Sequence, residues 1–103
     1  MRQWPLEAES VDVVFGLLAI HELRSEEERS AWFAEARRCL RKGGRVILVE
    51  HVRDLANFLA FGPGFLHFHS LASWRRNWES AQLRSLDDFR VTPWVRVFVL
   101  EAP

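Results

Sequence analysis

The chain has a single cysteine, no excess of either charge and no long apolar run. Cys39 cannot form a disulfide within the chain, and its place on the apolar side of a predicted helix favours a small core residue. Fourteen basic side chains balance fourteen acidic ones, so we expect no field that would attract nucleic acid. No apolar run reaches the roughly 18 residues that span a bilayer. The composition therefore predicts a cytoplasmic protein with no nucleic-acid or membrane partner.

A glycine-rich phosphate loop is also missing. Gly43 and Gly44 follow a predicted helix and precede a predicted strand, whereas a phosphate loop follows a strand and opens a helix. We expect Gly43 to be a left-handed C-cap and Gly44 to allow a tight turn into the strand from Arg45 to Glu50. Lys42-Gly43-Gly44 is therefore predicted to be the point where the helix stops.

The first half of the chain has the pattern of a strand, a helix and a second strand. Val11 to Leu18 is nearly continuous apolar sequence, which fits a strand covered on both faces, as in a parallel sheet. Ser25 and Glu28 form a capping box that starts the helix. The buried stripe of this helix is expected to contain Trp32, Phe33, Ala36, Cys39 and Leu40. The residues expected to face mostly outward are Arg29, Glu35, Arg38 and Lys42.

The second half begins with an aromatic segment and ends with two strands. Asn57 to Ser70 is interpreted as a long loop or broken helix, and segments of this kind commonly bind or cover a ligand. A helix is predicted to begin near Ser73, with Trp74, Trp78 and Leu83 packed on a sheet. Phe89 to Thr92 and Val95 to Leu100 are predicted to be antiparallel neighbours because so few residues connect them.

Three motifs, taken together with their order and spacing, resemble those of class I S-adenosylmethionine-dependent methyltransferases, and in particular those of the type 11-like group. The motifs are VDVVFGLLAIHEL at 11–23, ARRCLRKGGRVILVEH at 36–51 and FRVTPWVRVFVLE at 89–101. The resemblance covers roughly positions 4 to 101. It implies an α/β fold, a partial Rossmann-like sheet of parallel strands plus a C-terminal antiparallel hairpin, in which this chain supplies strands four to seven in the order four, five, seven, six.

The same resemblance implies that the N-terminal half of the domain is absent. The family's glycine-rich cofactor loop, and the acidic residue that holds the cofactor ribose, have no counterpart in the sequence. Residues 1–103 are thus expected to form a single, truncated methyltransferase domain. The isolated chain would carry only half of the cofactor site and is expected to be inactive.

The resemblance assigns S-adenosylmethionine as the cofactor and places three residues beside it. Gly16 and Leu17 match the end of the family's fourth strand, which passes close to the methionine part and the transferred methyl group. His21 occupies a position that borders the cofactor pocket. It is a weak candidate for a catalytic base, and a residue of the helix entry or of the pocket wall is the alternative.

The acceptor of the methyl group is expected to be a small molecule, although its identity is not encoded in any motif. Glu50 and His51 follow the next strand at the same edge as His21, so they either face the substrate or cap the following loop. Phe61 and Phe65 are the candidates for an apolar cover over the acceptor. A metal site at the alternate residues His67 and His69, completed by Glu50 or His51, has no clear third ligand, and no metal is predicted.

Truncation would leave an exposed apolar face and an unpaired strand edge at Val11 to Leu18. Self-association through that edge is the partner interaction that we predict. Two alternatives to an enzyme remain open at this point: a non-catalytic interaction module that pairs with itself or with a partner chain, and an unrelated small α/β binding domain. A strand order other than four, five, seven, six would favour the unrelated domain.

Overall fold

The computed structural model describes residues 3–17, 23, 25–51, 55–63 and 69–103. Helices and strands follow one another as the sequence predicts, with one short helix inside the aromatic segment. The elements are β1 (Val11–Leu17), α1 (Glu26–Cys39), β2 (Leu40–Glu50), α2 (Leu55–Phe61), α3 (Leu71–Ser80), β3 (Arg84–Thr92) and β4 (Val95–Glu101). No helix in these ranges is both long and apolar enough to cross a membrane.

The strands form one sheet in the order β1-β2-β4-β3. β1 runs parallel to β2, and β4 is antiparallel to both of its neighbours. This is the order four, five, seven, six that the resemblance implies, so the predicted fold class is confirmed. The result also counts against an unrelated α/β domain.

Helix α1 begins as predicted but ends earlier. The hydroxyl oxygen of Ser25 accepts a hydrogen bond from the amide of Glu28 at 3.0 Å, and Ser25 is the N-cap. The helix ends at Cys39, and Leu40 already has an extended backbone. Because buried Leu40 pairs with Val11 in the sheet, the chain enters β2 before it reaches the glycines. The prediction that Gly43 caps the helix is therefore wrong, although its φ of 85° is left-handed.

The remaining boundaries also differ from the prediction by a few residues. Helix α3 is capped by Ser70, whose hydroxyl oxygen accepts from the amide of Ser73 at 3.2 Å, so the helix begins before Ser73. Strand β3 begins at Arg84 rather than at Phe89, because its pairing with β4 continues to Glu101. The antiparallel arrangement of the two strands is confirmed.

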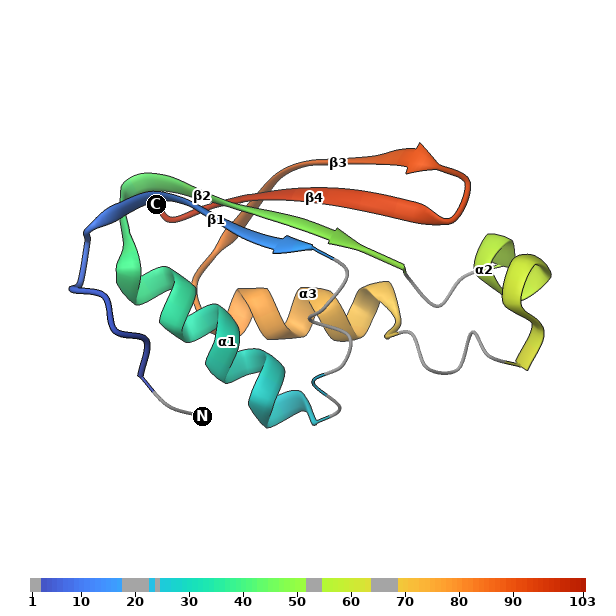
Figure 1. The fold of residues 1–103 in the computed structure, drawn as a ribbon, viewed down its shortest axis with the longest axis horizontal. Coiled ribbons are helices and arrows are strands. Elements are labelled where there is room, and N and C mark those ends of the chain that lie inside the picture. The colour runs from blue at the N-terminus through green and yellow to red at the C-terminus, as the bar shows by residue number, and fades with distance from the viewer. Residues whose placement is uncertain (1–2, 18–22, 24, 52–54, 64–68) are drawn as a thin grey trace.

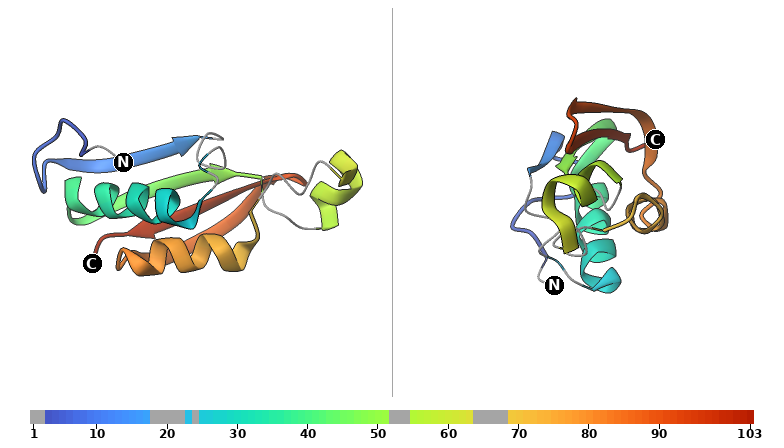
Figure 2. Two further views of the ribbon diagram at one scale, coloured as in Figure 1. Left: turned by 90° about the horizontal axis from the view of Figure 1, so that it is seen from below. Right: turned by 90° about the vertical axis from the view of Figure 1, so that its right-hand side faces the viewer.

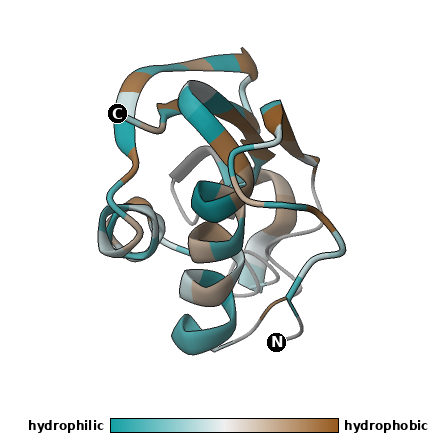
Figure 3. Cartoon of the chain, turned by 90° about the vertical axis from the view of Figure 1, so that its left-hand side faces the viewer, coloured by the Kyte–Doolittle hydropathy of each residue, from teal (hydrophilic) through white to brown (hydrophobic). Residues whose placement is uncertain are grey.

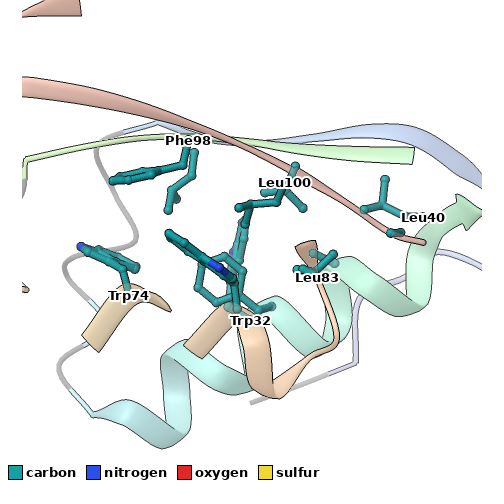
Figure 4. Close-up of a cluster of buried hydrophobic side chains, with 12 residues drawn as sticks. Trp32, Leu40, Trp74, Leu83, Phe98 and Leu100 are labelled. Atoms are coloured by element: carbon teal, nitrogen blue, oxygen red, sulfur yellow. The ribbon is translucent and has the colours of Figure 1, made fainter. Parts of the chain in front are cut away.

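Helices α1 and α3 cover the same face of the sheet, and between them lies the hydrophobic core (Figures 1 and 2). The ring of Phe33 lies 6.3 Å from Trp74, and Trp78 lies 5.2 Å from Phe98 on β4. Figure 4 shows Trp74 and Phe98, with other core side chains, between the helices and the strands. The core residues are Trp32, Phe33, Ala36, Leu40, Val46, Leu48, Trp74, Trp78, Leu83, Phe98, Leu100 and Ala102.

The opposite face of the sheet is apolar and carries no helix among the described elements (Figure 1). Side chains alternate between the two faces along a strand, so the neighbours of the core residues Leu48 and Phe98 point to this side. One row crosses all four strands through Leu17, Val49, Val97 and Phe89. Leu17 is 61% exposed and Phe89 is 46% exposed. Hydrophobic segments along the strands are visible in Figure 3. The exposed apolar face predicted from the sequence is confirmed.

One prediction about helix α1 is wrong in a consequential way. Arg29, expected to face outward, is only 3% exposed. Arg29 precedes Phe33 by one helical turn and therefore lies on the same face as the apolar stripe. Its guanidinium group points between α1 and α3, where it donates to side chains of α3.

Candidate functional site

The carboxyl ends of β1 and β2 meet at one edge of the sheet because the two strands are parallel. Gly16 pairs with Leu48, and Leu17 pairs with Val49. Gly16 is buried, whereas the side chain of Leu17 is largely exposed beside it. His21, the third residue assigned to the cofactor, lies outside the described residues. The strand end thus places the exposed apolar side chain of Leu17 next to a buried glycine.

Glu50 is the last residue of β2, one position beyond the partner of Leu17, and it is fully buried. In the antiparallel pair with β4 it lies directly opposite Arg96, so the two Cβ atoms are separated by roughly 5.5 Å or less. The guanidinium group of Arg96 donates to Asp88 at 2.5 Å and lies 5.3 Å from the ring centre of Phe98. Opposite charges on adjacent strands reduce the electrostatic cost of burying the carboxylate.

His51 connects the end of β2 to the β3–β4 hairpin. Its Nδ1 atom lies 2.9 Å from the carbonyl oxygen of Trp94. A carbonyl only accepts, so Nδ1 carries the proton of this hydrogen bond. The amide Nδ2 of Asn57 on α2 donates to the same carbonyl at 3.1 Å. The ring of His51 also meets the ring of Phe61 edge to face, with centres 5.3 Å apart.

The structure therefore brings some of the predicted site residues together. His51 and Phe61 are in contact, and Leu17 and Glu50 lie at the ends of adjacent strands. Helix α2 lies beyond the end of the sheet where β2 ends and the hairpin turns (Figure 2). Phe61 is 47% exposed. Phe65 lies outside the described residues, so the full acceptor cover is not visible.

Neither a ligand-sized pocket nor a metal-binding cluster is found within the described ranges. No pocket is enclosed by this part of the chain, and it contains no group of three or more histidine, cysteine or acidic residues placed to hold a metal. His69 is buried against Trp74, and His67 lies outside the described residues. The candidate site is thus an open edge of the sheet.

Sequence reasoning missed Asn57 and the backbone of Trp94. Asn57 is fully buried, and it is the only polar side chain in the α2 sequence LANFLAF. A buried polar side chain normally has a hydrogen-bonding partner, so a single asparagine in an otherwise apolar helix is the sequence signal that points to this contact. The carbonyl of Trp94 carries no side-chain signature, so only the fold shows that it accepts from both His51 and Asn57.

Comparison with known proteins supports the resemblance seen in the sequence. Residues 1–48 match the family model described as a methyltransferase domain. A protein from Sulfolobus solfataricus that is described as a type 11 methyltransferase has a similar structure, with a TM-score of 0.75 and 18% identity over 94% of this chain. A SAM-dependent methyltransferase from Aquifex aeolicus has a TM-score of 0.77 and 17% identity over 98% of this chain.

A third similar structure is an O-methyltransferase family 2 protein from Planctomyces limnophilus in complex with apigenin. It has a TM-score of 0.79 and 14% identity over all of this chain. The chain spans 53%, 50% and 33% of the lengths of the Sulfolobus, Aquifex and Planctomyces proteins. A search of curated proteins found no match. At these identities the structural similarity establishes the fold, which is that of about half of the Sulfolobus and Aquifex proteins.

Proposed function

We propose that the chain is part of a class I methyltransferase domain and takes part in the transfer of a methyl group from S-adenosylmethionine to a small-molecule acceptor; the family-model match to residues 1–48 and the similar structures support this. Residues 1–103 would form one truncated domain that carries half of the cofactor site. The observation that carries the proposal is the sheet order β1-β2-β4-β3, which places the ends of β1 and β2 side by side. In open α/β sheets, ligands bind at such strand ends.

The described residues fit one part of the cofactor. At the end of β1, Gly16 has no side chain that would separate a ligand from the backbone, and exposed Leu17 offers an apolar surface for the methionine part. The chain has no glycine-rich loop that would hold the rest of the cofactor. We therefore expect Gly16, Leu17 and His21 to line the cofactor without holding it tightly by themselves.

The protein's task in this reaction is mainly alignment. When bound, S-adenosylmethionine supplies a methyl group made electrophilic by the sulfonium, and the acceptor atom forms its bond to the methyl carbon as the carbon–sulfur bond breaks. Glu50, His51, Phe61 and Phe65 would orient the acceptor, because holding two reactants in line lowers the barrier. His21 is the candidate base for an acceptor that must lose a proton.

A small acceptor with apolar surface suits the part of the site that is described. The rings of His51 and Phe61 meet beyond the end of β2, and the side chain of Trp94 is 44% exposed on the adjacent turn. The chain has no net charge that would recruit a polyanion. The apigenin complex of the Planctomyces protein supports a small molecule in this fold. The cytoplasmic location stays a prediction from the sequence.

Titration of the 103-residue chain with S-adenosylmethionine, followed by amide NMR, tests both the cofactor and the half site. We expect weak binding, with shifts centred on Gly16 and Leu17 and none at Gly43, at the other end of the sheet. Shifts at Gly43 alone, or no shift up to millimolar cofactor, would overturn the assignment of the cofactor to β1. Saturable binding at micromolar concentration would support the cofactor but contradict the half-site interpretation.

A second candidate function is a non-catalytic module that associates with a second copy of itself. The specific observation in its favour is the apolar row from Leu17 to Phe89, which no described helix covers. The edge of β1 is also unpaired among the described strands, and an open edge can accept another strand. Sedimentation velocity and the cofactor titration together distinguish the two functions, because a stable dimer without cofactor affinity would favour the module.

A further inference from the structure

Arg29 is a buried cation that the proposed reaction does not use. It lies on α1, and its side chain connects that helix to α3. The Nε atom donates to Oδ1 of Asn77 at 2.8 Å, and Nη2 donates to the hydroxyl oxygen of Ser73 at 3.0 Å. Two edges of the planar guanidinium group are thus fixed by side chains one helical turn apart.

The remaining nitrogen of Arg29 contacts two distant parts of the chain. Nη1 donates to the carbonyl oxygen of Leu23 at 3.1 Å and lies 3.2 Å from Nε2 of His69. Arginine only donates, so Nε2 of His69 is the acceptor and the proton of its neutral ring is on Nδ1. One atom of Arg29 therefore bridges Leu23 and His69, which lie far apart in the sequence.

The two bridged residues lie next to the segments that the sequence assigns to the ligands. Leu23 follows the cofactor candidate His21 by two positions. His69 follows the acceptor candidate Phe65 by four positions, directly before the N-cap of α3. A movement of either segment that displaces Leu23 or His69 would change the hydrogen bonds available to the other through the shared nitrogen.

Packing alone does not require an arginine at this position. Removing a guanidinium group from water is costly, and an apolar side chain of similar volume often stabilises a buried site equally well. The guanidinium carbon lies 6.0 Å from the ring centre of Trp74, which offsets part of that cost. What an apolar residue could not provide is a rigid set of donors aimed in several directions at once.

We propose that Arg29 is a positioning residue that couples the segment after β1, at Leu23, to the segment before α3, at His69. In the function proposed above, this would link the cofactor side of the site to the acceptor side. The coupling itself is a property of the protein without ligand. It can therefore be measured even if the proposed methyl transfer is wrong.

The test is a double-mutant comparison in which the carbonyl carbon resonance of Leu23 is measured in the ligand-free chain. His69→Leu removes the acceptor, and we expect it to shift the Leu23 resonance, whereas His69→Gln retains an acceptor and should shift it much less. In the Arg29→Met background, the additional shift caused by His69→Leu should disappear. This readout reports a hydrogen bond, so a general loss of packing would not reproduce the pattern.

Two further variants keep the test decisive. Arg29→Lys keeps the charge but cannot reach all partners, so it should also abolish the coupling if Arg29→Met fails to fold. Arg38→Met is the matched control, because Arg38 lies on the same helix and donates to the carbonyl of Trp4 at 3.2 Å. It should leave the response of Leu23 to His69→Leu intact. An unchanged Leu23 resonance in His69→Leu, or a shift that persists without Arg29, would overturn the proposal.

Discussion

Nδ1 of His51 lies 2.9 Å from the carbonyl oxygen of Trp94, so the end of β2 is joined to the tip of the β3–β4 hairpin. The same carbonyl accepts from Asn57 on α2. Three separate parts of the chain thus meet at one backbone oxygen. The acceptor side of the candidate site depends on this junction, because it holds Phe61 against the ring of His51.

We expect His51→Phe to lower the free energy of unfolding by about 1 kcal/mol, because it keeps a ring beside Phe61 but loses the donor to Trp94. His51→Asn is the control, since the amide nitrogen of asparagine can occupy the place of Nδ1. Urea unfolding measures both variants, and amide exchange at Val95 reports the hairpin turn. Equal stability and exchange in wild type and His51→Phe would show that the hydrogen bond does not hold the junction.

The two glycines before the apolar part of β2 should respond differently to alanine. A Cβ atom on Gly44 would lie 2.8 Å from the backbone oxygen of Arg41 and 3.1 Å from that of Asp12, so the β1–β2 pair would have to shift. We expect Gly44→Ala to cost roughly 1–3 kcal/mol of unfolding free energy. A Cβ atom on Gly43 meets no atom within 4 Å, so Gly43→Ala carries only the strain of its left-handed backbone, about 1 kcal/mol.

Gly43→Asn separates these causes, because asparagine adopts left-handed backbone more readily than alanine. It should be more stable than Gly43→Ala, whereas Gly44→Asn should be no better than Gly44→Ala. Thermal unfolding of the four variants provides the measurement. The interpretation fails if Gly43→Ala is the most destabilised of them.

An exposed ion pair between α1 and α3 should make stability depend on acid. Arg76 donates to Glu26, with Nη2 at 2.6 Å, and this hydrogen bond together with the charge of Arg76 holds the pKa of Glu26 below its ordinary value of 4.5. The folded state thus binds this proton less tightly than the unfolded state does. The stability that the ionised Glu26 contributes is present above about pH 4.5, the ordinary pKa of the group. It is lost as the pH falls through the lower pKa of the folded state.

Glu26→Gln should therefore be less stable than the wild type at neutral pH and approach it in acid. Urea unfolding midpoints of the two proteins across the acid range measure the difference. In the Arg76→Gln background, the pH-dependent effect of Glu26→Gln should be much smaller, because Arg29 and Ser73 lower the pKa of Glu26 less than Arg76 does. A constant difference between wild type and Glu26→Gln at every pH would mean that the ion pair is not its source.

Hydrophobic spacing predicted the sheet and core but misjudged single polar residues. Arg29 stands one turn before Phe33, so the same spacing that identified the buried stripe also placed Arg29 on it. Taken alone, the charge of Arg29 predicts an exposed side chain. The acceptors that compensate for its burial, Asn77 and Ser73, lie more than 40 residues away in the sequence. Partners that distant in sequence leave no local pattern.

The end of helix α1 illustrates a second limit. Gly43 has the left-handed backbone that a C-cap glycine has, yet the helix ends at Cys39. Pairing of Leu40 with Val11 decides the boundary, and that contact depends on the tertiary arrangement of β1. For the candidate site, the ends of β1 and β2 followed from the parallel pattern, whereas the junction at Trp94 involves a backbone atom that no motif marks.

The apolar face of the sheet and the open edge of β1 lead to different predictions for self-association. Phe15 on β1 and Phe89 on β3 point to the same face, and they are 62% and 46% exposed. They lie on opposite edges of the sheet. A lysine on an edge strand blocks pairing with another strand. If a second copy pairs through β1, Phe15→Lys should dissociate the assembly and Phe89→Lys should not.

Sedimentation velocity over a range of protein concentrations provides the measurement. We expect wild type and Phe89→Lys to associate as the concentration rises and Phe15→Lys to remain monomeric. Equal loss of association in both variants would show that copies pack through the sheet face, since both side chains belong to it. A wild-type chain that stays monomeric at every concentration would contradict self-association altogether, and with it the second candidate function.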